Sequence, residues 1–155
     1  MVSKTIILDI DGVLVTTGSW KPVEIHNDGF SLFNSKASEH LNTIITKTQA
    51  RVLISSSHRN RYTNSQWKEI FENRGIHIHQ INTIDEFGDF SMCKSRAEEL
   101  TVLLYGNPLI KDYIIIDDDS SLNSLPSTMK SRLLLTHSLI GIDAQTMNTA
   151  IKILG

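Results

Sequence analysis

The stretch that decides the fold is IILDIDGVLV, residues 6–15, in which an aliphatic run leads directly into two aspartates and a glycine. Ile6 to Leu8 have the continuous apolar character of a strand that is buried on both faces. Asp9 and Asp11 follow, and two like charges this close together are costly to bury unless a cation or a chemical task retains them. The stretch therefore predicts a buried strand that ends at a functional site.

Further strands and helices are predicted along the chain. Residues 51–55, 113–117 and 132–136 are continuous aliphatic runs, and residues 75–81 alternate apolar with polar side chains, as an edge strand does. Apolar residues with helical spacing lie between these runs, at residues 35–50, 64–75, 92–106 and 143–154. Strands that alternate with helices of this length are joined by right-handed crossovers. The pattern predicts an α/β fold with a doubly wound, five-stranded parallel sheet.

The composition is that of a globular protein. The 155 residues fit a single domain over residues 1–155, with 40% hydrophobic and 21% charged residues. The net charge of -2 gives no general preference for nucleic acid or membranes. A single cysteine, Cys93, excludes an internal disulfide and fits a reducing cytoplasm. The first apolar run stops at Asp9, too early for a signal peptide core or a membrane span, so we expect a cytoplasmic protein without membrane contact.

Acids and hydroxyls follow three of the predicted strands. Asp9 and Asp11 come after the first strand, Ser55 and Ser56 at the end of the second, and Asp118 after the strand at 113–117. Because the carboxyl ends of parallel strands meet at one edge of the sheet, these side chains are expected to converge. Mg²⁺ prefers one or two carboxylates together with waters and phosphate oxygens. The sequence therefore predicts a Mg²⁺ site at this edge.

The same segments resemble a known family. DIDGVL (residues 9–14), VLISSS (52–57), Lys94 and IIIDDD (114–119) are similar, in this order, to the four motifs of the haloacid dehalogenase-like (HAD) superfamily of phosphohydrolases. Within it, the chain looks closest to the HAD domain of Swiss Army Knife RNA repair proteins, which often carry Ser-Ser-Trp-Arg where this chain has residues 56–59, Ser-Ser-His-Arg. The resemblance implies a HAD-like Rossmannoid fold and phosphatase chemistry.

The resemblance also implies catalytic roles. Asp9 would attack phosphorus and form an aspartyl-phosphate intermediate. Asp11 would protonate the leaving oxygen and then activate the hydrolytic water. Ser55 would bind the transferring phosphoryl group, and Lys94, at the start of the predicted helix 92–106, would offset its charge. The superfamily's dehalogenases lack the second acid, so Asp11 favours phosphate chemistry.

Metal and substrate contacts complete the expected site. Mg²⁺ would be held by Asp9, the backbone carbonyl of Asp11 and Asp118. Ser56 is an alternative to Ser55 for the phosphoryl contact. The guanidinium of Arg59 suits a second phosphate or a polynucleotide backbone, or equally a structural ion pair.

No cap domain is expected. Larger members of the superfamily close a cap over small substrates, but here the segment of about residues 13–34 is long enough only for a flap, expected to be a hairpin of Val13–Val15 with Val23–Ile25. Residues 60–91 likewise hold only one helix, one strand and a loop. Trp20 in the flap could stack on a base or sugar, or pack the flap down. An uncapped site admits a phosphate on a bulky molecule, unless a partner supplies a lid.

These features together predict an enzyme. We expect a Mg²⁺-dependent phosphomonoester hydrolase that acts on a large or accessible substrate such as a nucleic acid end. The alternatives are a phosphatase of nucleotides or sugar phosphates, and a non-catalytic Mg²⁺-binding module. Phosphotransfer to an acceptor other than water would share the first half-reaction.

Overall fold

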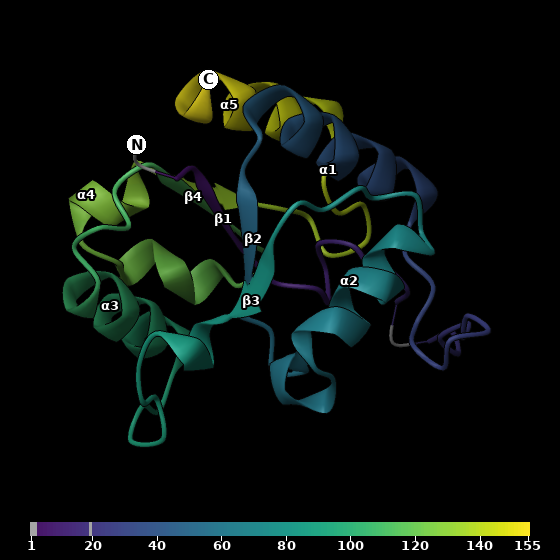
Figure 1. Ribbon diagram of the computed structural model, residues 1–155, viewed down its shortest axis with the longest axis horizontal. Coiled ribbons are helices and arrows are strands. Elements are labelled where there is room, and N and C mark those ends of the chain that lie inside the picture. Colours follow the sequence, from purple (N-terminus) through teal and green to yellow (C-terminus); the bar gives the residue numbers. More distant parts are fainter. Residues whose placement is uncertain (1–2, 19) are drawn as a thin grey trace.

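A five-stranded parallel sheet forms the centre of the computed structural model, which describes residues 3–18 and 20–155 (Figure 1). The strands, given with their bounds, are β1 (Thr5–Leu8), β2 (Arg51–Ile54), β3 (Ile81–Thr83), β4 (Tyr113–Asp117) and β5 (Leu133–Leu135). Their order in the sheet is β3-β2-β1-β4-β5, so the chain winds in one direction from β1 to β3 and then in the other through β4 to β5. The predicted α/β, doubly wound parallel fold is confirmed.

Helices cover both faces of the sheet. The α-helices are α1 (Ser35–Thr48), α2 (Asn64–Glu72), α3 (Arg96–Gly106), α4 (Ser127–Lys130) and α5 (Ala144–Leu154). Short 3₁₀ helices are η1 (Arg59–Arg61), η2 (Ile84–Glu86) and η3 (Ser120–Ser124). Figure 1 shows α1 and α5 side by side on one face, and α3 and α4 on the other. None of the helices in the described part of the chain is long and apolar enough to cross a membrane.

Alternate side chains of β1 supply two separate cores. Ile6 and Leu8 pack with side chains of α1, α2 and α5, whereas Ile7 packs with side chains of α3, α4 and η3. Successive residues of a strand point to opposite faces, so a strand covered on both sides has to be apolar throughout. The register pairs Leu8 with Ile54 on one side and with Ile116 on the other. The residues that follow β1 and β2, and the last residue of β4, therefore lie at the same level.

Two predicted elements begin later than expected. The edge strand expected at 75–81 is β3, Ile81–Thr83, because Gly75 with φ +79° turns the chain out of α2 and the backbone N–H of Ile76 bonds back to Phe71. The helix expected at 92–106 begins at Arg96, because Ser95 accepts a hydrogen bond from the Glu98 N–H and acts as its N-cap.

The expected hairpin in the flap is not formed. Val13–Val15 are buried in the core, and the Leu14 carbonyl accepts a hydrogen bond from the Asn34 N–H. Ile25 instead pairs with Ser31 in an isolated antiparallel bridge. The aliphatic character of Val13–Val15 thus serves the core and not a flap strand. Within the described residues, neither the flap nor the chain between β2 and α3 forms a cap domain.

Candidate active site

Three aspartates converge at the carboxyl edge of the central strands. Asp9 follows β1, Asp117 ends β4 and Asp118 comes next in the chain, and one carboxylate oxygen of each lies within 4.8 Å of the others. Asp9 and Asp117 are buried. The structure therefore brings together Asp9 and Asp118, as predicted, and adds Asp117 to the cluster.

Burial of these acids changes their titration. Burial and the neighbouring Asp9 raise the pKa of Asp117 to about 7, against an opposing effect of Arg96. The same two causes raise the pKa of Asp118. Like charges in a partly dehydrated site resist ionisation together, and a divalent cation relieves that repulsion. Oxygen donors of this kind fit Mg²⁺.

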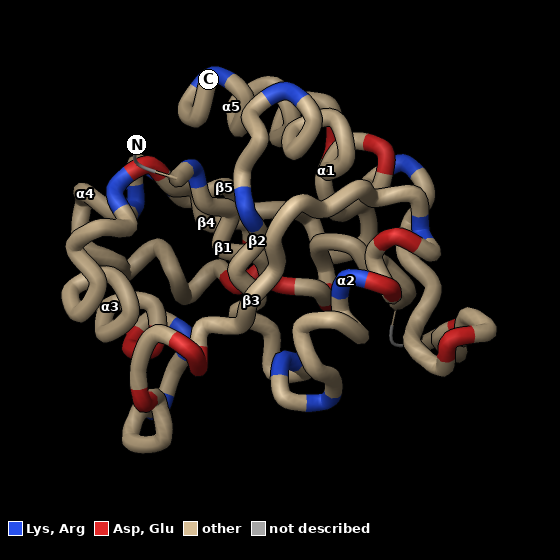
Figure 2. Tube along the Cα trace, viewed as in Figure 1, with Lys and Arg blue, Asp and Glu red and all other residues tan. Residues whose placement is uncertain are grey.

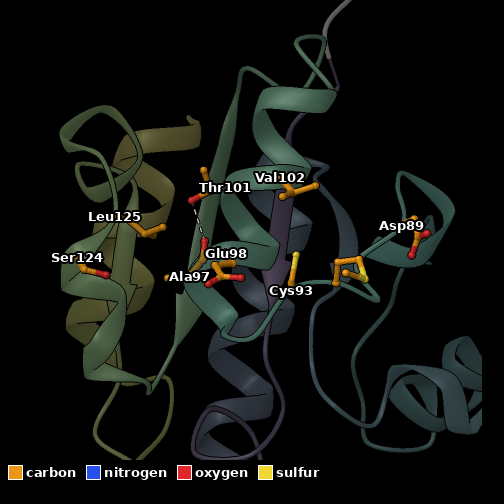
Figure 3. Close-up of a pocket in the computed structure, with 9 residues that line it drawn as sticks. Asp89, Cys93, Ala97, Glu98, Thr101, Val102, Ser124 and Leu125 are labelled. Carbon is orange, nitrogen blue, oxygen red and sulfur yellow. Dashed lines mark hydrogen bonds between the residues drawn. The ribbon is translucent and has the colours of Figure 1, made fainter.

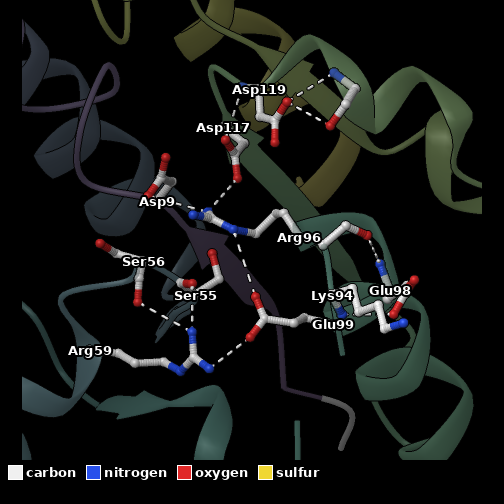
Figure 4. A network of polar contacts seen from close by, with 12 residues as sticks. Asp9, Ser55, Ser56, Arg59, Lys94, Arg96, Glu98, Glu99, Asp117 and Asp119 are labelled. Carbon is white, nitrogen blue, oxygen red and sulfur yellow. Dashed lines mark hydrogen bonds and ion pairs between the residues drawn. The ribbon is translucent and has the colours of Figure 1, made fainter. Parts of the chain in front are cut away.

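The cation that contacts this cluster is Arg96, in the first turn of α3. One terminal nitrogen lies 2.8 Å from Asp117 Oδ2 and 3.3 Å from Asp9 Oδ1 (Figure 4). Burial opposes the charge of the guanidinium, but attraction to Asp9 and Asp117 outweighs burial and raises the pKa of Arg96. The sequence interpretation missed Arg96. Two features of the sequence could have indicated Arg96: the serine directly before it, which caps the helix, and its own place as a basic residue in the first helical turn.

Lys94 precedes the helix and lies apart from the aspartates. It is exposed, and its backbone N–H donates to the Glu98 carboxylate at 2.9 Å. In Figure 4, Arg96 lies between Asp9 and Glu99, whereas Lys94 lies on the far side of Glu99. Because α3 starts at residue 96, its first basic side chain reaches the edge and Lys94 does not. The catalytic role of Lys94 stays a prediction.

Ser55 presents an unsatisfied hydroxyl beside the cluster. Its backbone N–H donates to the Leu8 carbonyl at 3.0 Å, which continues the ladder between β2 and β1. Its side chain is fully buried, and Oγ has no hydrogen-bond partner among the described residues. A buried hydroxyl without a partner costs about 1–3 kcal/mol, and beside the acidic cluster this one is available to a ligand. The hydroxyl of Ser56 already accepts a hydrogen bond from the His58 N–H at 3.1 Å, which favours Ser55 for the phosphoryl contact.

Arg59 is held by protein groups. Its Nε lies 2.9 Å from Asp85, a terminal nitrogen lies 2.8 Å from Glu99, and the other donates to the carbonyls of Ser55 and Ser56. Burial opposes its charge, but hydrogen bonds to the two carboxylates raise its pKa. The structural ion pair that the sequence offered as an alternative for Arg59 is thus present, and the same side chain holds the backbone carbonyls of Ser55 and Ser56. A contact of Arg59 with substrate stays a prediction.

The turn after Asp9 sends Asp11 in another direction. Gly12 has φ +78°, and a Cβ there would lie 2.0 Å from Asp118 Oδ2, so only glycine allows this approach. The Thr136 hydroxyl donates to the Gly12 carbonyl at 2.7 Å and holds the turn. The Asp11 side chain is 60% exposed, with Oδ2 2.8 Å from His58 Nε2. Asp11 therefore faces the open side of the site, and His58 is its partner.

A separate hollow lies beside α3 (Figure 3). It has a volume of about 440 Å³ and is lined mainly by apolar groups, among them Ala97, Val102 and Leu125. Burial and nearby carboxylates raise the pKa of the Cys93 thiol at its rim, so this cysteine is not an activated nucleophile. None of the predicted site residues lines this hollow.

The comparison with known families agrees with this geometry. The family model for the HAD domain in Swiss Army Knife RNA repair proteins matches residues 5–147, from β1 into α5. No curated protein matches the chain. HAD domains are generally phosphohydrolases. Because the match covers all five strands of the sheet and its acidic edge, the chain belongs to the family of HAD domains found in Swiss Army Knife RNA repair proteins.

Proposed function

We propose that this protein is a Mg²⁺-dependent phosphomonoester hydrolase that acts through an aspartyl-phosphate intermediate on Asp9. The observation that carries the proposal is the buried Ser55 hydroxyl, which has no hydrogen-bond partner among the described residues and lies at the edge where Asp9, Asp117 and Asp118 meet. A phosphoryl group supplies what each part of this edge lacks: an acceptor for the hydroxyl and an electrophile for the nucleophilic carboxylate.

Each side chain has a distinct task in the proposed reaction. A bond forms between an Asp9 carboxylate oxygen and phosphorus as the bond from phosphorus to the leaving oxygen breaks. Asp11 gives its proton to the leaving oxygen, and then takes a proton from the water that hydrolyses the intermediate. Ser55 donates a hydrogen bond to the transferring group. Arg96, at 3.3 Å from Asp9, offsets the negative charge that gathers there.

Asp9 and Asp118, with the carbonyl of Asp11, are the residues that would hold Mg²⁺. Asp117 is less suited, because one of its oxygens accepts from the Asp119 N–H at 3.0 Å and the other from Arg96 at 2.8 Å. Asp117 is better suited to orient Arg96. Bound Mg²⁺ supplies neutralisation of charge on the phosphoryl oxygens.

The open edge favours a phosphate carried on a large molecule. No cap domain covers the site within the described residues, which supports a nucleic acid end as substrate. Lys and Arg are spread over many elements along the trace (Figure 2). Such a distribution suits recognition of an end better than of a long duplex, whose binding needs many cations. A small nucleotide or sugar phosphate is the alternative substrate. We also propose that the protein acts in the cytoplasm.

Phosphate release in the presence of Mg²⁺ tests the function. Wild type, Asp9→Asn and Asp112→Asn are compared on 5′- and 3′-phosphorylated oligonucleotides, a mononucleotide and an aryl phosphate. Asp112 precedes β4 at the opposite edge of the sheet, so Asp112→Asn controls for loss of a carboxylate near a strand. We expect Asp9→Asn to lose at least about 10⁴-fold in kcat, as loss of a nucleophile does, and Asp112→Asn to retain activity.

The pattern of substrates decides between the alternatives. Preference for an oligonucleotide supports end processing, and turnover of the mononucleotide alone assigns a small-molecule phosphatase. Undiminished activity in Asp9→Asn would remove Asp9 as the nucleophile. Mg²⁺ binding without any turnover would favour the non-catalytic module.

A further inference from the structure

A groove runs from the proposed general acid to the flap. It has a volume of about 600 Å³, within the usual range of ligand sites. Asp11 and Asp118 of the candidate active site are among its lining residues, and so are Trp20 and Leu139. The groove is thus continuous with the candidate active site, yet the proposed reaction does not use Trp20 or Leu139.

Trp20 presents a flat, supported surface in this groove. The side chain is 76% exposed, which is unusual for the largest apolar residue in a protein. Its ring lies against Gly18, where an added Cβ would be 2.3 Å from ring atoms Cη2 and Cζ3. One part of the indole therefore rests on backbone while much of it faces solvent. Indoles in this position stack on planar ligand groups.

The groove lies on the leaving-group side of the reaction. Asp11, which would protonate the leaving oxygen, is one of its lining residues. Ser55 and Arg96, which would contact the phosphoryl group and Asp9, are not among its described lining residues. A substrate with its phosphorus at Asp9 and its leaving oxygen at Asp11 therefore extends its leaving group toward Trp20.

The charge of the groove restricts what that group is. Its described lining includes two carboxylates and no Lys or Arg. Lys21 lines the adjoining hollow that shares Trp20 and Leu139, and not the groove itself. Further phosphates beside Asp11 and Asp118 would face acids without a cation in the groove lining, which is unfavourable. The apolar side chains of Val23 and Leu139 extend the surface around Trp20. The lining suits an uncharged, flat and largely apolar group.

We propose that this groove is a leaving-group subsite, which binds an uncharged planar ring of the phosphomonoester by stacking it on Trp20. This inference rests on the proposed phosphatase function and narrows its substrate class. A nucleobase one sugar away from the phosphate is a group of this chemistry, whether on a free nucleotide or at the end of a strand.

A matched pair of substrates tests the ring directly. Adenosine 5′-monophosphate and ribose 5-phosphate share a primary leaving oxygen, and only the first carries the base. We expect kcat/KM in wild type to favour adenosine 5′-monophosphate by about tenfold or more, the gain that stacking on an aromatic side chain gives. Trp20→Ala should reduce this ratio to near one, and Trp20→Phe should preserve most of it.

Two further variants separate the subsite from general damage. Gly18→Ala introduces a methyl group where the Trp20 ring lies, so it should displace the ring and lower the ratio without removing the indole. Tyr105→Ala removes another exposed aromatic, 68% exposed on α3, and should leave both rates unchanged. A ratio near one in wild type, or a ratio insensitive to Trp20→Ala, would overturn the proposal.

Binding distinguishes failure of the subsite from failure of the enzyme. Adenosine 5′-monophosphate and ribose 5-phosphate are titrated into Asp9→Asn with Mg²⁺, with and without Trp20→Ala, and the indole fluorescence is followed. Quenching by the nucleotide that disappears with Trp20→Ala supports the subsite even if no variant turns over. Equal affinity for both compounds rejects it. A 5′-phosphorylated oligonucleotide with an intact or an abasic first residue then shows whether the ring belongs to a strand end.

Discussion

Arg74 and Arg96 both face carboxylates in this molecule, with opposite results. The Arg74 side chain is 4% exposed and donates to both oxygens of Asp28 and to the carbonyls of Ile70, Phe30 and Ser31. Chiefly through the Arg74 hydrogen bond, the pKa of Asp28 falls well below its usual range. Arg74, which follows α2, thus binds Asp28 of the flap, and its donors find their acceptors within the protein.

Arg96 is placed differently. It faces Asp9 and Asp117, with Asp118 close by, so acids outnumber the cation. The pKa of Asp117 rises to about 7 because of burial and of Asp9, and the Ser55 hydroxyl has no partner among the described residues. Such imbalance is typical of sites that complete their contacts with a ligand. The comparison teaches that Arg74 meets one carboxylate and completes its contacts inside the protein, whereas the cluster at Arg96 holds more carboxylates than cations.

Of the effects that bear on this comparison, the largest concerns which cation serves the reaction. Arg96→Gln should lower kcat/KM by about 10³-fold, because the charge that offsets the phosphoryl group is lost. Lys94→Gln, two residues away, should lower it less than about threefold, since Lys94 lies outside the cluster. Steady-state kinetics on one substrate measures both. The reverse ranking would restore Lys94 to the role that its motif implies.

The next largest effect is on stability, through the ion pair between Arg74 and Asp28. Asp28→Ala should lower the free energy of unfolding by about 3 kcal/mol, because it leaves a buried guanidinium without its carboxylate. Asp89→Ala is the matched control: Asp89 also accepts a hydrogen bond from the N–H two residues later, but it is exposed. Its loss should cost less than about 1 kcal/mol. Urea titrations measure both, and equal losses would contradict the contrast.

The ion pair between Arg74 and Asp28 should weaken in acid. The pKa of Asp28 is lowered in the folded protein, so its contribution is complete above the unfolded value of about 3.9 and is lost as pH falls through the folded value. The difference in unfolding free energy between wild type and Asp28→Ala should therefore be constant from about pH 5 to 7 and should shrink below about pH 4. Urea titrations across this range measure it. A difference that grows in acid would mean that the pKa is raised instead.

The smallest expected effect separates two buried hydroxyls. Ser55 and Ser38 both have an unpartnered Oγ among the described residues, but only Ser55 lies at the acidic edge, since Ser38 is in α1. Ser55→Ala should lower kcat/KM about tenfold, the value of one hydrogen bond to a charged group, without lowering the unfolding free energy. Ser38→Ala should leave kinetics unchanged. Equal kinetic effects of the two would deny Ser55 a phosphoryl contact.

Much of the sheet was predictable because its signals are local. Continuous aliphatic runs mark strands buried on both faces, and the four strands predicted from them exist, whereas the edge strand predicted at 75–81 forms only at Ile81–Thr83. The approach of Asp9 and Asp118 followed from parallel topology alone. The conformation of Val13–Val15 could not be predicted in this way, because a short apolar run has the same composition in a flap as in a core.

By itself, the sequence determined the parallel sheet, the order of the motifs and the edge at which the acids meet, since each depends on patterns within a few residues. Only the tertiary structure decided that Arg96 contacts Asp9, that Arg59 is bound by carboxylates, that Asp11 turns to His58 and that Trp20 lines the groove. These contacts depend on where a helix starts and on how distant segments pack. When the N-cap of a helix lies one or two residues later in the chain, a different side chain reaches the site, and the local sequence pattern does not determine the position of the N-cap.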